Sequence, residues 1–377
     1  MSKESPSNIV IFVNVDWFVL SHFIKYLKKL LNEGNEVTLI TADTGKIQEI
    51  KDEGVKVNTI ALDKGYSGIF KEINSFIKIY MAIKELKPDV LELITIKPIL
   101  YGGICGRLLG VNKIIFYMAG LGAFFTSNGL FSRLKGFIIA TLYKIIMNSN
   151  KSRLILENED DLSHFQSLLK IPKDNFFLIP GVGIDINSYP KKKYVRLQKN
   201  IKILMIGRLL YDKGVMEYTQ ASKIILESYP DIEFFLAGDS DGSNPSSISP
   251  EDLDLLKNST HINYLGFVED IPLLLSETDL FILPSYREGF PKSIMEASAS
   301  GTPSITTDVV GCRSAVIDNE TGILIKPRQV ESIVNAIKFF LQDLEQLRIM
   351  GGKARRHALD NFDERILTQL HIKVLKE

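Results

Sequence analysis

Short apolar runs alternate with longer amphipathic segments along the chain, and this alternation restricts the possible folds more than any other feature. Runs such as "NIVIFVNV" at 8–15 and "EVTLIT" at 36–41 are rich in β-branched residues. The stretch between them includes "FIKYLKKLLNEGN" at 23–35, which has apolar residues at helical spacing. Apolar strands that alternate with helices predict parallel sheets with right-handed crossovers.

The alternation occurs in two series, which indicates two domains. The second series begins with "NIKILMIGRL" at 200–209. The preceding segment, 183–200, is polar and basic and carries Pro190, as expected of a linker. We therefore predict two doubly wound, Rossmann-like α/β domains over 1–190 and 191–363. They are expected to face each other across a ligand cleft, at the carboxyl ends of their strands.

The composition argues against several classes of protein. Basic and acidic residues number 45 each, so no overall field attracts nucleic acid. The two cysteines, Cys105 and Cys312, are too few and too far apart for a disulfide framework, which favours a reducing, cytoplasmic setting. Asn14 and Asp16 interrupt the first apolar run, so we expect no signal peptide.

The charges are unevenly distributed along the first domain. Between Leu93 and Leu156 there is no Asp or Glu, but there are eight Lys or Arg. Within this zone, "LFSRLKGFIIATLYKIIMNSNKSR" at 130–153 has an apolar body with basic flanks. Such a helix fits an anionic membrane surface, and it also fits packing between a sheet and solvent. Peripheral association with the inner face of the cytoplasmic membrane is therefore a hypothesis.

Four charged residues of the second series are predicted to converge at one edge of its sheet. Glu288 and Glu296 follow the apolar run "DLFILPSY" at 279–286, and Arg208 and Lys213 follow the strand "ILMI". The carboxyl ends of parallel strands share one edge, so these side chains can meet. The cations suit phosphate oxygens, and the carboxylates can accept hydrogen bonds from sugar hydroxyls. The combination suits a nucleotide diphosphate that is joined to a sugar.

The backbone between the two glutamates supports this interpretation. Gly289 allows close approach to a ligand, and Pro291 is suited to the first position of a helix. The free N–H groups at the start of that helix favour an anion.

The first domain offers candidates for binding a second substrate. The loop "NVDWFVLSH" ends in His22, which could orient a hydroxyl or stabilise phosphate charge, or could simply pack beside Trp17. "AGLGAFF" carries Gly120 and Gly122, which would open a loop toward the cleft or merely form a turn. Lys97 follows another strand and could meet a diphosphate.

These motifs resemble a known family. "GRLLYDKG", "EFFLAGD", "YLGFVEDIPLLLSETDLFILPSYREGFPKSIMEASASGTP" and "TGILI" resemble the C-terminal domain of family 4 (group 1) glycosyltransferases. The Glu-x7-Glu pair is the main mark of that family. "WFVLSHF", "AGLGAFF" and "IPGVGIDINSY" are similar to the subgroup that adds sugars to polyprenyl-diphosphate-linked acceptors in bacterial surface glycan synthesis.

The resemblance implies a GT-B fold and sugar transfer with retention of anomeric configuration. No cofactor or metal is expected, since the nucleotide sugar is a co-substrate. The implied donor is a UDP-sugar rather than a GDP-sugar, with N-acetylhexosamine as the first choice and hexose as the second. The implied acceptor is a polyprenyl-diphosphate-linked saccharide of an O-antigen, capsule or glycoprotein glycan. The last helix, about 364–377, is expected to pack back on the first domain.

By position, the resemblance assigns the donor diphosphate to Arg208 and Lys213, the donor sugar to Glu288 and the ribose to Glu296. The first three of these, together with His22, form the expected catalytic group. In the first domain, relatives carry a histidine near "LITIKP", where this chain has Lys97. The expected acceptor-binding residues are His22, Lys97, Gly120 and Gly122. The remaining donor-binding positions are Gly266, Phe267, Gly289, Phe290 and Pro291.

Three alternatives remain at this point. The first is a metal-dependent transferase, because Asp239-Ser-Asp241 and Asp252-Leu-Asp254 match its Asp-X-Asp motif. The Gly- and Ser-rich surroundings of the first match also fit a plain loop at the rim. The second is a nucleotide-sugar 2-epimerase of similar architecture, which needs no acceptor. The third is a glycan-binding protein without activity.

Overall fold

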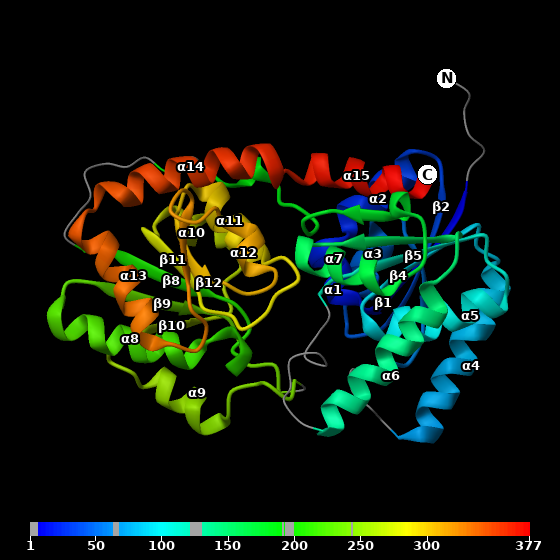
Figure 1. Ribbon diagram of the computed structural model, residues 1–377, viewed down its shortest axis with the longest axis horizontal. Helices are drawn as coiled ribbons and strands as arrows, with labels where there is room; N and C mark the ends of the chain where they lie inside the picture. The colour runs from blue at the N-terminus through cyan, green and yellow to red at the C-terminus, as the bar shows by residue number, and fades with distance from the viewer. Residues whose placement is uncertain (1–6, 63–67, 121–129, 191, 193–199, 243) are drawn as a thin grey trace. The chain divides into compact units, whose positions relative to one another are not determined.

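Two separate parallel sheets organise the chain (Figure 1). The computed structural model describes residues 7–62, 68–120, 130–190, 192, 200–242 and 244–377, with the backbone alone at 130–137. The chain divides into a first unit, made of Met1–Val182 with Thr368–Glu377, and a second unit, Gly183–Leu367. The prediction of two doubly wound α/β domains is confirmed.

The division falls earlier than the expected boundary after residue 190. Residues 183–190 belong to the second unit because they join its core. The N–H of Ile184 donates to the carbonyl of Phe362 at 2.9 Å, and the N–H of Glu364 donates to the carbonyl of Ile184 at 3.0 Å. The polar composition of this segment concealed these contacts, which depend on chain distant in sequence.

In the described part of the first unit, seven strands form a parallel sheet in the order β3-β2-β1-β4-β5-β6-β7. The strands are β1 Asn8–Val15, β2 Glu36–Ala42, β3 Lys56–Thr59, β4 Val90–Ile94, β5 Lys113–Met118, β6 Ser152–Leu156 and β7 Phe176–Leu178. The chain moves outward from β1 through β2 and β3 and then returns to pair β4 with the other side of β1. This reversal places a switch point at the carboxyl ends of β1 and β4, where ligands of doubly wound sheets bind.

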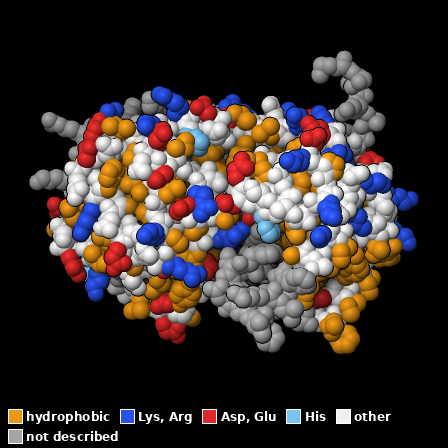
Figure 2. Space-filling model, viewed as in Figure 1, with side chains coloured by type: hydrophobic (Ala, Val, Ile, Leu, Met, Phe, Trp, Pro, Cys, Tyr) orange, Lys and Arg blue, Asp and Glu red, His pale blue; other side chains and the backbone are white. Residues whose placement is uncertain are grey.

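Helices cover the faces of the first sheet (Figure 1). They are α1 Asp16–His22, α2 Ile24–Asn32, α3 Ile47–Asp52, α4 Ile69–Leu86, the π-helical turn η1 Pro98–Gly102, α5 Gly103–Leu108, α6 Leu130–Met147, α7 Glu159–Leu168, the 3₁₀ turn η3 Lys173–Asn175 and the end of α15 Glu364–Lys376. Helix α4 ends where Lys87 adopts a left-handed conformation and Pro88 prevents further helix. Hydrophobic side chains gather on the surface over α4 and α5, at the lower right of Figure 2.

The segment Thr368–Glu377 is tied to the first unit by specific contacts. His371 is buried, with Nε2 2.6 Å from Oε1 of Glu92, a buried residue of β4. The Tyr26 ring stacks on His371 at 4.0 Å, and its hydroxyl donates to the other Glu92 oxygen at 2.7 Å. Lys113 also donates to the carbonyl of Leu375 at 2.6 Å. These polar contacts, together with buried apolar residues, fix the end of α15 against the sheet.

The described part of the second unit holds a parallel sheet of six strands in the order β10-β9-β8-β11-β12-β13. The strands are β8 Lys202–Ile206, β9 Glu233–Ala237, β10 Asn263–Gly266, β11 Leu280–Leu283, β12 Ser304–Thr307 and β13 Gly322–Ile325. The helices are η4 Ile186–Ser188, η5 Tyr211–Lys213, α8 Val215–Ser228, α9 Pro250–Lys257, α10 Ile271–Ser276, α11 Lys292–Ser300, α12 Cys312–Ala315, α13 Val330–Gln342 and α14 Glu345–Asn361.

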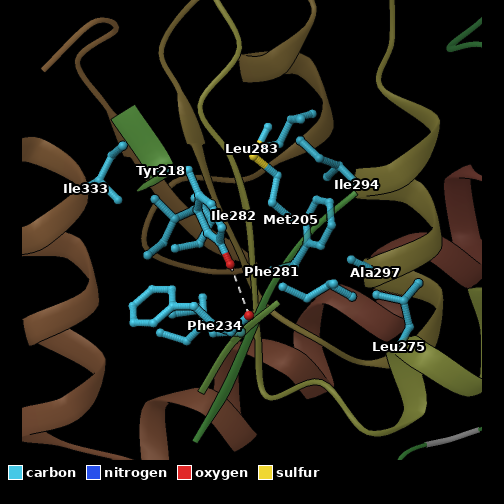
Figure 3. Close-up of a cluster of buried hydrophobic side chains, with 14 of the residues drawn as sticks. Met205, Tyr218, Phe234, Leu275, Phe281, Ile282, Leu283, Ile294, Ala297 and Ile333 are labelled. Atoms are coloured by element: carbon cyan, nitrogen blue, oxygen red, sulfur yellow. Dashed lines mark hydrogen bonds between the residues drawn. The ribbon is translucent and has the colours of Figure 1, made fainter. Parts of the chain in front are cut away.

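The core of the second unit holds the strands that carry the predicted site. Phe234, Phe281 and Ile282 pack with side chains of the covering helices, including Ile294 (Figure 3). The Tyr218 hydroxyl is buried there and donates to the carbonyls of two strand residues at 3.1 and 2.8 Å. A buried hydroxyl that is hydrogen-bonded costs little, so the core stays closely packed. This packing fixes β8 and β11, from whose carboxyl ends the predicted charged residues extend.

Candidate functional site

Lys213 and Glu288 form an ion pair at the carboxyl edge of the second sheet. Lys213 ends η5 after β8, and Glu288 follows β11, the neighbour of β8. Both side chains are mostly buried, with exposures of 19% and 12%. A Cβ on Gly214 would lie 2.3 Å from the carbonyl oxygen of Pro284, so the two loops can approach this closely only with glycine there. The structure thus brings these two predicted residues together.

The Glu288 carboxylate is held in one orientation. Lys213 and the Ser285 hydroxyl both contact its Oε1, the latter at 2.7 Å. The Glu288 N–H donates to the carbonyl of Val310 at 3.1 Å. A Cβ on Gly311 would lie 2.3 Å from the Glu288 carbonyl oxygen, so this loop also packs tightly against the next one. Tight packing on both sides suits a side chain that must meet a ligand in a defined position.

Arg208 pairs with Asp241, which is not one of the four charged residues that were predicted to converge. Its Nη1 lies 3.2 Å from Oδ2 of Asp241, and its side chain is 49% exposed. Asp241 lies in the loop after β9, the other neighbour of β8. The guanidinium therefore lies at the same sheet edge as Lys213, and one of its nitrogens is paired with the Asp241 carboxylate. The sequence singled out Asp241 only as part of a metal motif.

Glu296 lies inside α11 and is almost fully buried, with 8% exposure. The Tyr189 hydroxyl donates to its Oε1 at 3.0 Å, and Lys292 Nζ lies 3.8 Å from the same oxygen. Burial raises the pKa of the Glu296 carboxyl, while Lys292 and the Tyr189 hydrogen bond oppose that rise. Sequence analysis missed Tyr189, which was assigned to a linker. An aromatic residue within this mostly polar segment could have indicated that the segment packs against a core.

The start of α11 differs by one residue from the prediction. Pro291 occupies the N-cap position in an extended conformation, and Lys292 is the first helical residue. Phe290 packs edge-on against Phe362 at 5.5 Å, so its ring belongs to the core. The backbone of Gly289 and Phe290 leads directly into the start of this helix, and a helix start favours an anion.

Gly266 and Phe267 lie at the end of β10, at the same edge. Gly266 has a positive φ of 66°, and its carbonyl accepts a 2.7 Å hydrogen bond from the N–H of Gly238. Phe267 follows with 72% exposure. An exposed aromatic ring at the edge of the sheet is available for stacking on a planar ligand.

His22 ends a short helix rather than a loop. The segment after β1 is the helix α1, and His22 is its last residue, two positions before the start of α2 at Ile24. The His22 ring stacks on Phe18 at 4.3 Å, and the Phe18 ring in turn meets Trp17 edge-on at 5.8 Å. The residue directly after β1 is the buried Asp16, which accepts hydrogen bonds from Thr44 and Lys46 N–H groups at 2.8 and 2.9 Å. Asp16 is the first residue of α1, the helix that the sequence analysis had predicted to be a loop.

Lys97 is engaged by α4 at the carboxyl edge of the first sheet. Its Nζ lies 3.0 Å from Oε1 of Glu72, and the Tyr101 hydroxyl donates to Oε2 of Glu72 at 2.6 Å. The Lys97 and Glu72 side chains are mostly buried, at 17% and 12% exposure. Gly120, after β5, has φ 74° and forms a turn to Met118. Gly122 lies outside the described residues.

Two polar side chains at the switch point were missed. Oδ1 of Asn14 and Oγ1 of Thr95 are buried and have no hydrogen-bond partner among the described residues. They lie at adjacent strand ends, since Val13 of β1 pairs with Ile94 of β4. Thr95 also has a positive φ of 76°, a strained conformation that concentrates at ligand sites. Their positions at the ends of central strands could have indicated them.

The acidic triplets have separate partners. Asp239 accepts a 3.0 Å hydrogen bond from Tyr264, whereas Asp241 pairs with Arg208. Asp252 accepts from the Tyr211 hydroxyl. Across the ranges that the structure describes, no three His, Cys, Asp or Glu side chains gather as a metal site would require.

In those same ranges, no helix combines the length and apolarity needed to cross a bilayer.

Comparison with known proteins identifies both halves of the chain. A family model for group 1 glycosyl transferases matches residues 190–357. A second model, for glycosyl transferase 4-like domains, matches residues 8–158. Together the two matches extend over both sheets.

Two similar curated proteins cover most of the chain. An N,N'-diacetylbacillosaminyl-diphospho-undecaprenol alpha-1,3-N-acetylgalactosaminyltransferase of Campylobacter jejuni is 28% identical over 365 residues, which is 94% of each chain. A UDP-Gal:alpha-D-GlcNAc-diphosphoundecaprenol alpha-1,3-galactosyltransferase of Escherichia coli is 28% identical over 89% of this chain and 87% of its own.

Among solved structures, Anabaena HepE in complex with UDP and glucose has a TM-score of 0.76 at 18% identity, covering 98% of this chain and all of its own. At that identity the likeness establishes the fold. The family and the enzyme class predicted from the motifs are confirmed. The chain is therefore a glycosyltransferase with the GT-B fold, in which a glycosyl transferase 4-like domain at 8–158 precedes a group 1 glycosyl transferase domain at 190–357.

Proposed function

We propose that this enzyme transfers a sugar from a UDP-sugar to a polyprenyl-diphosphate-linked saccharide during bacterial surface glycan assembly. Lys213 and Glu288, paired beside Arg208 and the start of α11, are the observation that carries the proposal. This edge has the cations that a diphosphate needs and a carboxylate placed for a sugar hydroxyl. The names of the two curated relatives support the donor and acceptor classes.

In the proposed reaction, the bond between the sugar C1 and the β-phosphate oxygen breaks, and C1 bonds to an acceptor hydroxyl oxygen. Arg208 and Lys213 stabilise the charge that develops on the departing UDP. Glu288 accepts a hydrogen bond from the donor sugar through its Oε2, because Oε1 already receives Lys213 and Ser285. The departing phosphate takes the acceptor proton, and the sugar keeps its anomeric configuration.

We assign the nucleoside to the edge formed by Glu296 and Phe267. The Glu296 carboxylate accepts hydrogen bonds from the ribose, and the exposed Phe267 ring lies against the base. N-acetylhexosamine is the preferred donor sugar and hexose the second, since the relatives are named as N-acetylgalactosaminyl and galactosyl transferases. The two cations take the charge-balancing role that a divalent ion has in other transferases, so the proposed reaction needs no metal.

We assign the acceptor to the switch point of the first sheet. The side-chain oxygens of Asn14 and Thr95 are available there for hydrogen bonds. The Lys97 ammonium can bind a diphosphate while it stays paired with Glu72. His22 is the expected residue for orienting the acceptor hydroxyl. Because the acceptor is lipid-linked, the proposed site of action is the cytoplasmic face of the membrane.

A panel of UDP- and GDP-sugars tests this function. Each is incubated with a short-chain lipid diphosphate carrying N-acetylhexosamine, and products are identified by mass spectrometry and their anomeric configuration by NMR. We expect transfer from one UDP-sugar, with retention, and with EDTA present. Transfer only from GDP-sugars, inversion, or loss of activity in EDTA would contradict the corresponding part of the proposal.

Site variants and a reaction without acceptor separate the remaining alternatives. We expect Lys213→Ala and Arg208→Ala to lower kcat by about 10²-fold or more, because each removes a group that stabilises developing charge. Undiminished turnover in both would show that the site is elsewhere. Epimerised nucleotide sugar formed without an acceptor would identify the 2-epimerase instead.

A further inference from the structure

The outer face of α4 is apolar although its inner face already packs on the core. Ile79, Ala82 and Ile83 are buried on the inner side. A second apolar stripe on the solvent side of a helix marks a surface that contacts protein or lipid. In the described chain, five large apolar side chains on the other side of α4 nevertheless stay exposed. They are Ile69, Phe70, Ile73, Ile77 and Met81, with exposures of 61, 86, 52, 53 and 57%.

Neighbouring helices extend this surface. Helix α5 packs against both α4 and α6, and it exposes Leu108 at 68%. The described part of α6 exposes Ile138 at 50% and Ile145 at 70%. Figure 2 shows hydrophobic side chains gathered over α4 and α5. Single exposed apolar residues are common on proteins, but a continuous group of them marks an interaction surface.

The charges around this surface are mainly positive. Among the described side chains of α4, α5 and α6, the exposed charged residues are four lysines and one glutamate. They are Lys71, Lys78, Lys84, Lys144 and Glu85. Lys71 and Lys78 are seven residues apart and so lie along one margin of the apolar stripe. A helix with an apolar face bordered by lysines is suited to lie in the interface of an anionic membrane.

We propose that the outer face of α4 docks on an anionic lipid bilayer, with its apolar side chains at headgroup depth and its lysines on lipid phosphates. This inference rests on the proposed function, in which the acceptor is carried by a membrane lipid. The sequence predicted that 130–153 could lie on the membrane, but the side chains at 130–137 lie outside those described. The structure assigns the main contact to α4, with α6 at its side.

The position of α4 relates this surface to the acceptor site. Glu72, in the first turn of α4, holds Lys97 at 3.0 Å at the carboxyl edge of the first sheet. The apolar stripe begins at Ile69, in the same turn. A bilayer under α4 would therefore present lipid-linked diphosphates next to the residues proposed to bind them.

Vesicle co-sedimentation tests the proposal with the full chain. Wild type is expected to bind vesicles containing about one-third phosphatidylglycerol, and to bind pure phosphatidylcholine more weakly because each lysine contributes about fivefold. The double variant Ile73→Gln, Ile77→Gln should lower the partition coefficient about tenfold or more. Ile224→Gln with Leu359→Gln is the matched control, because both residues are apolar, about 40–46% exposed and on helices of the second unit.

Three outcomes would overturn the proposal. The first is failure of wild type to bind phosphatidylglycerol vesicles at low salt. The second is equal loss of binding in the control variant. The third is a wild-type dimer in sedimentation equilibrium that the Ile73, Ile77 variant dissociates, which would make this face a protein interface. Circular dichroism checks that the variants are folded.

An activity assay separates this proposal from the proposed function. On a short, water-soluble acceptor, the Ile73→Gln, Ile77→Gln variant should have wild-type activity, because both side chains are more than half exposed and neither belongs to the proposed site. It should lose activity only on vesicle-borne acceptor. Activity lost on the soluble acceptor with vesicle binding intact would refute docking. Absence of transfer by wild type from every UDP-sugar would instead refute the proposed function.

Discussion

The Tyr189 hydroxyl donates a 3.0 Å hydrogen bond to Glu296, and so joins the first segment of the second unit to the helix α11. The bond is buried, and Tyr189 is further held by Arg355, which donates to its carbonyl at 2.7 Å. Glu296 is the residue assigned to the ribose. Tyr189 is therefore positioned to orient the carboxylate that we propose binds the ribose.

Loss of this hydrogen bond should weaken donor binding. In Tyr189→Phe the hydrogen bond no longer lowers the pKa of Glu296, so that pKa should rise further. We expect the donor KM to increase about fivefold with little change in kcat, and the acidic limb of kcat/KM to move to higher pH. Steady-state kinetics between pH 5 and 8 give the answer. An unchanged pH profile would mean that Tyr189 only packs.

The buried Glu296 should also affect stability. Burial raises its pKa above the ordinary 4.5, so the folded chain binds more protons than the unfolded chain just above that pH. Its contribution to stability is therefore largest at low pH and falls as the pH rises through the raised pKa. We expect Glu296→Gln, which stays uncharged, to remove this dependence and to be more stable than wild type at neutral pH. Urea unfolding across the pH range measures it; a less stable Gln variant at neutral pH would contradict the argument.

Asp241 should compete with the donor diphosphate. It pairs with Arg208 at 3.2 Å, and this ion pair reduces the positive charge that the half-exposed guanidinium offers to phosphate. Exposed ion pairs contribute about 0–1 kcal/mol, so Asp241→Asn should tighten UDP binding by up to about fivefold. Isothermal titration with UDP measures this. Weaker binding in the variant would indicate that Asp241 contacts the nucleotide itself.

Phe267 should contribute to nucleotide affinity through stacking. Its ring is 72% exposed at the end of β10, and a base stacked on an aromatic ring gains about 1–3 kcal/mol. We expect Phe267→Ala to raise the Kd for UDP about fivefold or more. Leu255→Ala provides the control, because Leu255 is also apolar, is 68% exposed and lies in α9. Equal effects of the two substitutions would remove Phe267 from the site.

His371 should stabilise the first unit strongly. It pairs with the fully buried Glu92 at 2.6 Å, and breaking a buried pair from one side leaves an uncompensated group. We expect His371→Leu to lower the free energy of unfolding by about 3 kcal/mol or more. In the double variant with Glu92→Gln, most of that loss should be recovered. Chemical denaturation of the set measures the coupling, and additive losses would show that the two residues act separately.

The sequence by itself determined the architecture and the family. Apolar β-branched runs such as 8–15 and 202–206 are strands in the structure because β-branched side chains favour strands and a central parallel strand is buried on both faces. Lys213 and Glu288 could be expected to meet because both follow neighbouring strands of one parallel sheet. One local prediction was wrong: 16–22 is a helix rather than a loop. Its Val19 is buried, and Asp16 accepts hydrogen bonds from the backbone of Thr44 and Lys46.

Only the tertiary structure decided which partners the site residues have. Arg208 pairs with Asp241, Lys97 with Glu72 and Glu296 with Tyr189. The members of each pair are 33, 25 and 107 residues apart. Strand order brings loops to a common edge, but which side chains touch there depends on the path of each loop and on the packing beneath it. Each contact joins residues that are close in space but distant along the chain. The local sequence pattern around one member therefore does not predict the other.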